Sequence, residues 1–200
     1  MNRLINILMA AVLFVVFLPL MLCIAVSIKL TSRGPVLHLS KRVGRDNILF
    51  RMPKFRTMYS QTPQLATHLL TDAERWITPV GAILRKTSLD ELPQLWSVLI
   101  GQMSFVGPRP ALFNQDDLIE LRSSRGIDRQ LPGLTGWAQI NGRDNISIPD
   151  KVALEEYYLQ RRSLRLDVAI LARTIVKVLR RDDVANSGPT SLPSAPRRVA

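Results

Sequence analysis

The chain has 200 residues, enough for one domain of ordinary size with a substantial hydrophobic core. Its 27 Lys and Arg residues against 16 Asp and Glu give a net charge of +11, which favours an anionic partner such as a phosphate substrate, an anionic lipid or a nucleic acid. The single cysteine, Cys23, lies in an apolar run, so a disulfide framework and a cysteine-based zinc site are excluded.

The amino-terminal segment predicts a membrane element. Residues 4–28 carry no formal charge, and as one helix they would reach about 37 Å, longer than a bilayer core of roughly 30 Å. A cleaved signal peptide is not expected, because the apolar run is too long and ends in Lys29 without a small-residue cleavage site.

Pro19 leaves two arrangements of this segment open. A proline removes a backbone donor, so the segment is either a kinked spanning helix or a helix that breaks and returns as a re-entrant hairpin. The positive-inside tendency keeps the chain after this segment cytoplasmic, on account of five cations: Lys29, Arg33, Lys41, Arg42 and Arg45. Arg3 and the free amine favour the same side for the start of the chain, which only the hairpin satisfies.

Short elements with frequent turn signals come after the apolar segment. Extended pieces are expected at 35–39 and 48–50, with a basic loop at 42–46. Helices are expected at four places: 77–84, interrupted at its start by Pro79; 92–100; about 150–161; and 166–179. Glycine-marked turns are expected at 132–137 and 141–144, and disorder beyond Asp182.

The last expected helix is amphipathic. Its apolar residues recur at helical spacing, namely Val168, Leu171, Ile175 and Val178, and its cations are Arg173, Lys177, Arg180 and Arg181. This pattern suits a helix on an anionic membrane surface and, equally, an ordinary helix packed on the protein surface.

Asp90 and Glu91 are adjacent carboxylates preceded by basic residues. Ser88 with Glu91 three residues later fits a capping box, and Pro93 makes Asp90 the preferred cap of the next helix. An acid pair among cations can also hold a divalent metal and attack a phosphoryl group. Both roles are compatible, because the helix dipole that favours a cap also keeps Asp90 ionised.

Five cations stand in short, rigid settings: Lys54, Arg56, Arg85, Arg109 and Arg143. Arg109, for example, lies between Pro108 and Pro110. Surface arginines are usually only solvated, but arginine also suits bidentate capture of phosphate oxygens, with lysine as a point charge beside it. No Walker loop, zinc motif or dinucleotide fingerprint occurs in the sequence.

Five motifs occur in order, at 28–32, 54–58, 86–95, 104–110 and 132–143, and the third reads Lys86-Thr87-Ser88-Leu89-Asp90-Glu91-Leu92-Pro93-Gln94-Leu95. With this ordered set the chain resembles the bacterial sugar transferases, which are small monotopic polyprenyl-phosphate phosphoglycosyl transferases, from its amino terminus to about Val184. The resemblance implies an α+β, mostly helical fold with short strands and interfacial amphipathic helices. Three parts are implied: a re-entrant membrane anchor over 1–30, a cytoplasmic catalytic domain over 31–182 and a disordered tail over 183–200.

The anchor would break at Pro19. Members of the family often have serine before this proline, where the chain has Leu18. A serine hydroxyl could satisfy a backbone group freed by the break, so the depth and angle of the hairpin stay open.

The resemblance also implies a two-step reaction on the cytoplasmic face of the bacterial inner membrane. Asp90 would attack the sugar-linked phosphate of a UDP-sugar, release UMP and form a phosphosugar-aspartyl intermediate, from which undecaprenyl phosphate takes the phosphosugar. Glu91 would position Mg²⁺, held by both acids, or assist proton transfer, and the five cations match motif positions as phosphate-binding candidates. The implied donor is a UDP-N-acetylamino sugar of O-antigen, capsule or glycoprotein-glycan pathways.

The implied partners include membrane lipids, a homodimer is compatible with the resemblance, and nucleic acid is not among the partners.

Two other functions stay open on the residues alone. A membrane-anchored basic module would bind an anionic partner without catalysis. An enzyme of the same fold that hydrolyses a nucleotide-linked diphosphate would not need the prenyl phosphate.

Overall fold

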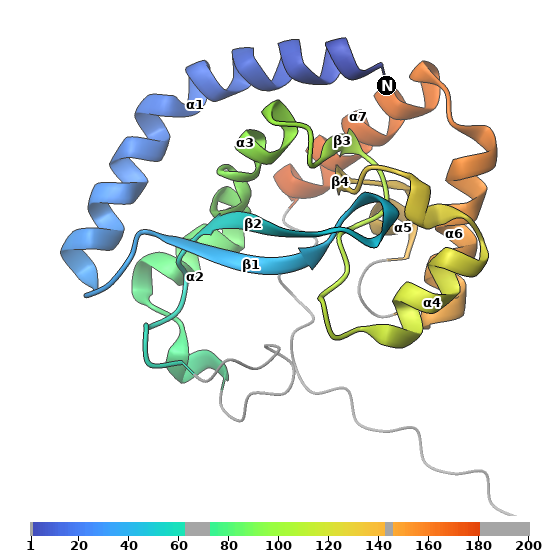
Figure 1. Cartoon of the computed structure of the whole chain (residues 1–200). Helices are drawn as coiled ribbons and strands as arrows, with labels where there is room; N and C mark the ends of the chain where they lie inside the picture. Colours follow the sequence, from blue (N-terminus) through green and yellow to red (C-terminus); the bar gives the residue numbers. More distant parts are fainter. Residues whose placement is uncertain (1, 63–72, 143–145, 181–200) are drawn as a thin grey trace, which may run out of the picture.

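One long helix, α1 (Arg3–Thr31), lies across the rest of the chain in the computed structural model, which describes residues 2–62, 73–142 and 146–180 (Figure 1). The helix continues through Pro19 and bends along its length (Figure 1), as expected where a proline removes a backbone donor. Among the described residues it is the one helix long and apolar enough to cross a membrane. The re-entrant hairpin itself stays a prediction.

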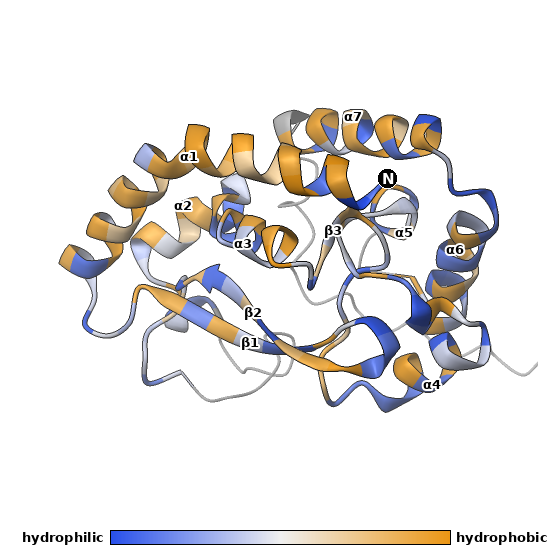
Figure 2. Cartoon of the chain, turned by 45° about the horizontal axis from the view of Figure 1, so that its top comes forward, coloured by the Kyte–Doolittle hydropathy of each residue, from blue (hydrophilic) through white to orange (hydrophobic). Residues whose placement is uncertain are grey.

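Both ends of α1 contact the same body. Near its start, Asn6 is buried, and its Oδ1 accepts hydrogen bonds from the Phe105 backbone N–H at 2.9 Å and the Ser104 hydroxyl at 3.0 Å. Near its end, Ile28 is buried in a cluster with Phe55. Figure 2 shows α1 apolar along nearly its whole length, and most of its large apolar residues between these ends are exposed.

A hairpin of two antiparallel strands comes next, β1 (Leu37–Val43) and β2 (Leu49–Phe55). Both strands are longer than predicted, and Arg42, expected in a loop, lies in β1 opposite Phe50. Its guanidinium donates to the Pro110 carbonyl at 3.2 Å, so the side chain turns inward although the local sequence is basic. Alternate residues of a strand share a face, and this places Lys54 on the face that also carries Phe50 and Met52.

The expected helices occur, with shifted ends: α2 (Pro79–Thr87), α3 (Gln94–Leu99), α6 (Ile148–Arg161) and α7 (Leu164–Arg180). Pro79 does not interrupt α2 but begins it, where its missing N–H costs nothing, and the Thr78 hydroxyl caps the helix by accepting from Gly81 N. Two helices were not predicted, α4 (Asp116–Ser124) and the short α5 (Trp137–Asn141). The prediction of a mostly helical chain with a few short strands is confirmed.

The predicted cap at Asp90 is wrong. Asp90 and Glu91 lie inside a short 3₁₀ turn, η4 (Leu89–Glu91), and α3 begins after Pro93, which caps it without a side-chain bond. Ser88 precedes η4 in the left-handed conformation and makes no side-chain cap bond either. The capping box therefore does not form, because Glu91 is held by cations from other elements instead.

A second sheet joins two of the motifs. Its strands β3 (Ser104–Val106) and β4 (Gly133–Thr135) are parallel and two glycines bring them into close contact. A Cβ on Gly133 would lie 2.2 Å from the Gly107 nitrogen, and one on Gly136 would lie 2.1 Å from the Gly107 oxygen. Only glycine fits at such distances. The glycines of the 104–110 and 132–143 motifs are therefore needed in part for the packing of the two strands.

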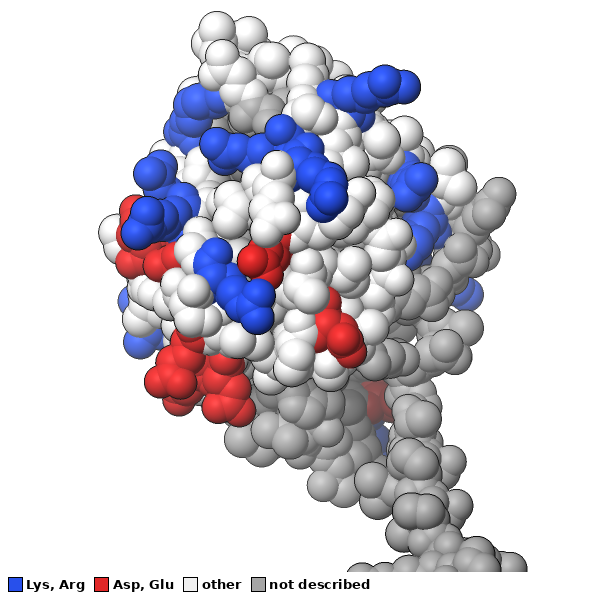
Figure 3. Space-filling model, turned by 90° about the vertical axis from the view of Figure 1, so that its right-hand side faces the viewer, with Lys and Arg blue, Asp and Glu red and all other residues white. Residues whose placement is uncertain are grey.

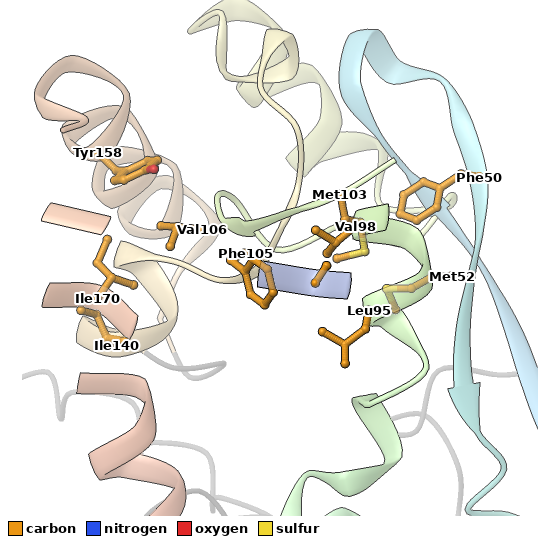
Figure 4. Close-up of a cluster of buried hydrophobic side chains, with 11 residues drawn as sticks. Phe50, Met52, Leu95, Val98, Met103, Phe105, Val106, Ile140, Tyr158 and Ile170 are labelled. Carbon is orange, nitrogen blue, oxygen red and sulfur yellow. The ribbon is translucent and has the colours of Figure 1, made fainter. Parts of the chain in front are cut away.

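The main hydrophobic cluster lies between the hairpin, α3, β3 and the carboxyl-terminal helices (Figure 4). Phe50 and Met52 enter it from β2, Leu95 and Val98 from α3, and Ile170 from α7. Ala10 of α1 belongs to the same cluster, whereas Met21, Ile24 and Ile28 belong to a second one with Phe55 and Leu84. The predicted anchor thus shares its cores with the body of the protein.

The predicted apolar stripe of α7 faces mostly outward. Val168, Ile175 and Val178 are exposed, while Ile170 and Asp167 are fully buried. The helix therefore packs through one face and leaves a second apolar face open.

Candidate active site

The acid pair sits at the meeting point of η4, the hairpin and the 107–110 loop. Lys54 Nζ lies 2.6 Å from Glu91 Oε1 and 4.0 Å from Asp90 Oδ2. Arg109 Nη2 donates to the same Glu91 oxygen at 3.2 Å. Two of the predicted cations, from motifs far apart in the sequence, therefore meet the predicted acids.

The pKa values of the two carboxyl groups are shifted in opposite directions. Burial raises the pKa of Asp90, while the charges of Lys54 and Arg85 oppose this rise. Burial also tends to raise the pKa of Glu91, but Arg109 and Lys54 outweigh it and hold the Glu91 pKa at about 2. Glu91 is therefore a fixed anion, and Asp90 is the more basic of the pair.

Arg85 belongs to the site through its charge, which acts on Asp90. Its Nε donates to the Thr57 hydroxyl at 3.0 Å, and this bond fixes the guanidinium at the end of α2. Burial lowers the pKa of Arg85, and Asp90 opposes the decrease. An arginine whose charge acts on the more basic acid can stabilise negative charge that develops there.

Arg56 has a different environment from the other candidates. Its guanidinium is buried and donates to the carbonyls of Ser32 and Arg33 and to the Ser60 hydroxyl. These bonds tie the turn after α1 to the residue that follows β2, and the structure does not bring Arg56 to the acids. Arg143 lies outside the described residues, and its role stays a prediction.

Sequence reasoning missed two residues of the site, Arg42 and His38. Burial and, to a smaller extent, Arg109 lower the pKa of Arg42 to about 10 against the opposing charge of Glu91, so the Arg42 charge lies within reach of both residues. His38 pairs with Lys54 across the hairpin, and burial, Lys54 and Arg42 all lower the His38 pKa. The signal was present in the two-residue alternation of β1, which places both residues on the Lys54 side.

The cations outnumber the acids in this cluster. Lys54, Arg42, Arg85 and Arg109 act on two carboxylates, as the ion pairs and pKa shifts show. Such an excess suits a ligand with about two negative charges, and a diphosphate meets this requirement.

A divalent metal fits this site only together with a ligand. The described residues contain no group of three or more acids, histidines or cysteines that could hold a metal. Mg²⁺ usually takes one or two carboxylates and completes its shell with phosphate oxygens and waters. Lys54 and Arg109 both reach Oε1 of Glu91, which makes Oε2 and the Asp90 oxygens the suitable protein ligands.

Comparisons with known proteins agree with this chemistry. Residues 1–181 match the family model described as "Bacterial sugar transferase". The chain is 39% identical over 179 residues to a UDP-N-acetylgalactosamine-undecaprenyl-phosphate N-acetylgalactosaminephosphotransferase of Aeromonas hydrophila, covering 87% of this chain and 42% of the relative. It is 38% identical over 194 residues to the exopolysaccharide production protein ExoY of Rhizobium meliloti (strain 1021), covering 88% of this chain and 84% of the relative.

A third relative uses a different sugar. The UDP-glucose:undecaprenyl-phosphate glucose-1-phosphate transferase of Escherichia coli (strain K12) is 36% identical over 179 residues, which cover 86% of this chain and 39% of the relative. The chain thus spans less than half the length of the first and third relatives and most of the second.

Proposed function

The chain belongs to the bacterial sugar transferase family, and from this premise we propose that it transfers a sugar 1-phosphate from a UDP-sugar to undecaprenyl phosphate. Two relatives are named as transferases with this acceptor and UDP-linked donors. One observation carries the proposal for this chain, namely that Asp90 and Glu91 lie together among Lys54, Arg85 and Arg109.

Asp90 is the nucleophile in the proposed reaction. One of its oxygens attacks the phosphorus that carries the sugar, and the bond from this phosphorus to the bridging oxygen breaks. UMP leaves with the electron pair, and the phosphosugar stays on Asp90 as an acyl phosphate. An oxygen of undecaprenyl phosphate then attacks the same phosphorus, which releases Asp90 and gives a polyprenyl diphosphate sugar.

The surroundings of the two acids suit this division of roles. Burial removes water from Asp90 and makes it more basic, which strengthens a nucleophile. Glu91 stays ionised beside Lys54 and Arg109 and holds these cations where the diphosphate would lie. Asp90 and Glu91 would hold Mg²⁺, and the bound metal would neutralise charge on the diphosphate.

The proposed donor is a UDP-N-acetylamino sugar. The relative from Aeromonas hydrophila supports this choice, because it is named for N-acetylgalactosamine, whereas the relative from Escherichia coli is named for glucose. A screen of UDP-sugars for UMP release, with undecaprenyl phosphate and Mg²⁺ present, decides the matter. Faster release from UDP-glucose than from any N-acetylated donor would contradict the choice.

A re-entrant anchor with a cytoplasmic catalytic body is part of the proposal. Support comes from α1, both of whose ends contact the body, through Asn6 and through Ile28. A straight spanning helix would place one of these ends on the far side of the membrane. Basic side chains also predominate in the upper half of the face in Figure 3, towards α1 and α7, which suits an anionic lipid surface. The exposed stripe of α7 would lie at this surface, and a homodimer stays a prediction.

The arrangement is tested with a small tag at the amino terminus in intact spheroplasts. An impermeant reagent is expected to leave the tag unlabelled until the membrane is opened. Labelling from the periplasmic side would refute the re-entrant anchor while leaving the proposed reaction intact.

The reaction is tested by Asp90→Asn in the purified, membrane-inserted protein. This variant is expected to release no UMP, and mass spectrometry of the wild type with donor alone is expected to find the phosphosugar on Asp90. Glu156→Gln is the matched control, because the partners of Glu156 among the described residues are Arg125 and Gln160 and include neither acid of the pair. Full UMP release by Asp90→Asn would point to another nucleophile. A wild-type protein that releases no UMP, and that binds an anionic partner as well as Asp90→Asn does, would favour a non-catalytic binding module. UMP release that continues over many turnovers without prenyl phosphate would identify a hydrolase.

A further inference from the structure

The backbone of the 107–110 loop decides where Arg109 stands relative to Glu91. Its two prolines have no N–H, so Pro108 and Pro110 cannot donate to a neighbouring strand or helix. Their carbonyls still need donors if the loop is to be held in one position. The position of Arg109 therefore depends on what reaches these carbonyls.

Three successive carbonyls of the loop receive hydrogen bonds from three different elements. Pro108 O accepts from the Gly133 N–H at 2.9 Å, in β4. Arg109 O accepts from Arg122 Nη2 at 3.0 Å, in α4. Pro110 O accepts from Arg42 Nη1 at 3.2 Å, in β1.

Arg122 is itself held by a buried partner. Its Nε donates to Glu155 Oε2 at 2.8 Å, and its Nη2 donates to Glu155 Oε1. Arg122 is 8% exposed and Glu155 4%, so neither charge has much contact with water. The guanidinium of Arg122 thus joins α4 to α6, and its Nη2 also donates to the loop.

A second ion pair joins the same two helices without reaching the loop. Arg125 Nη1 lies 2.7 Å from Glu156 Oε2, and the Arg125 side chain is 53% exposed. An exposed pair is enough to link two helices, and it avoids the cost of burying two charges. Helix linkage alone therefore does not account for the buried pair.

We propose that Arg122 and Glu155 are positioning residues for Arg109, and that this buried ion pair sets the affinity of the site for the diphosphate of the donor. Arg122 orients the Arg109 carbonyl, and Glu155 fixes the orientation of Arg122. Arg42 supports the next carbonyl and also faces the cluster of charges. This inference rests on the proposed function, because it assumes that Arg109 contacts the donor diphosphate.

The experiment replaces the buried pair by apolar residues, as Arg122→Met with Glu155→Leu. Such a replacement often keeps or raises stability, because no buried charge is left unpaired. It removes the donor to Arg109 O, so UDP is expected to bind at least tenfold more weakly by calorimetry, and the KM for the UDP-sugar is expected to rise by a similar factor. The matched control, Arg125→Met with Glu156→Leu, is expected to change neither quantity more than twofold.

A combination with Arg109→Gln separates positioning from a general structural effect. If the buried pair acts through Arg109, adding Arg122→Met and Glu155→Leu to Arg109→Gln is expected to weaken UDP binding less than twofold further. A further tenfold loss would refute the inference, and so would wild-type affinity in the apolar variant.

Arg122→Lys provides the same test if the apolar variant does not fold. A lysine keeps the charge beside Glu155 but has no second branch for Arg109 O, so UDP is expected to bind at least threefold more weakly, and wild-type binding would refute the inference. Failure of the proposed function is distinct, because the wild-type protein would then release no UMP.

Discussion

Lys54→Met removes the cation that lies nearest to both acids. Methionine keeps an unbranched side chain of similar length, so the packing on the inner face of β2 is largely kept. Lys54 counteracts the rise in the Asp90 pKa that burial produces. Its loss is therefore expected to raise the Asp90 pKa further and to move the acid limb of the activity profile to higher pH.

The structure gives the size of this shift. Lys54 Nζ and Asp90 Oδ2 are 4.0 Å apart, and at this distance an effective dielectric constant of about 20 gives about 4 kcal/mol, or about three pH units. Both side chains retain some exposure, 17% and 13%, and water will enter the space that the ammonium leaves. The expected shift is therefore about one to two pH units.

The assay is single-turnover UMP release from the UDP-sugar over a pH series, without undecaprenyl phosphate. Leaving out the acceptor matters, because a phosphate monoester itself titrates near pH 6. Lys41→Met is the matched control, since Lys41 lies in the same hairpin and packs over the Phe113 ring instead.

An acid limb that stays in place, or moves to lower pH, would refute the reasoning that Lys54 keeps Asp90 ionised. An equal shift in Lys41→Met would show that the total charge of the protein, and not the ion pair, controls the limb.

Further predictions concern stability. Gly81→Ala is expected to destabilise the fold by about 1–3 kcal/mol in urea unfolding, because its Cβ would lie 2.0 Å from the Thr57 oxygen; an unchanged midpoint would contradict this contact. Tyr158→Phe is expected to cost about 1–3 kcal/mol, since its hydroxyl donates to the fully buried Asp167 at 2.6 Å, and unchanged unfolding would show that Asp167 does not need this donor. The Glu91 pKa is lower in the folded protein, so the stability that Glu91 contributes is present above its ordinary pKa of 4.5 and is lost as pH falls through about 2. That loss is expected to reach about 3 kcal/mol in acid unfolding and to be absent in Glu91→Gln, and an identical pH dependence in both proteins would exclude it.

The acid pair and three of its cations could be named from the sequence, because the motifs keep them in short, rigid settings. Lys54, Arg85 and Arg109 all reach the acids by contact or by charge. Arg56 could not be separated from them, because the hydrogen bonds that it donates to two backbone carbonyls form only when the turn after α1 is folded.

Long-range partners account for most of what was missed. Arg42 reads as part of a basic loop, and only the hairpin register and a carbonyl 68 residues away turn it inward. Arg122 and Glu155 could not be singled out from the sequence, since the partner of each lies 33 residues away on another helix. The cap at Asp90 failed for a related reason, because ion pairs with Glu91 from outside η4 compete with the local capping pattern.

The sharing of cores between α1 and the rest of the chain bears on how the protein can be prepared. Met21, Ile24 and Ile28 pack against Phe55 and Leu84. Removal of residues 1–31 would therefore expose hydrophobic surface on the fragment that begins at residue 32. Such a fragment is expected to aggregate when expressed. Detergent or nanodisc extraction of the intact chain is the better route to material for kinetics.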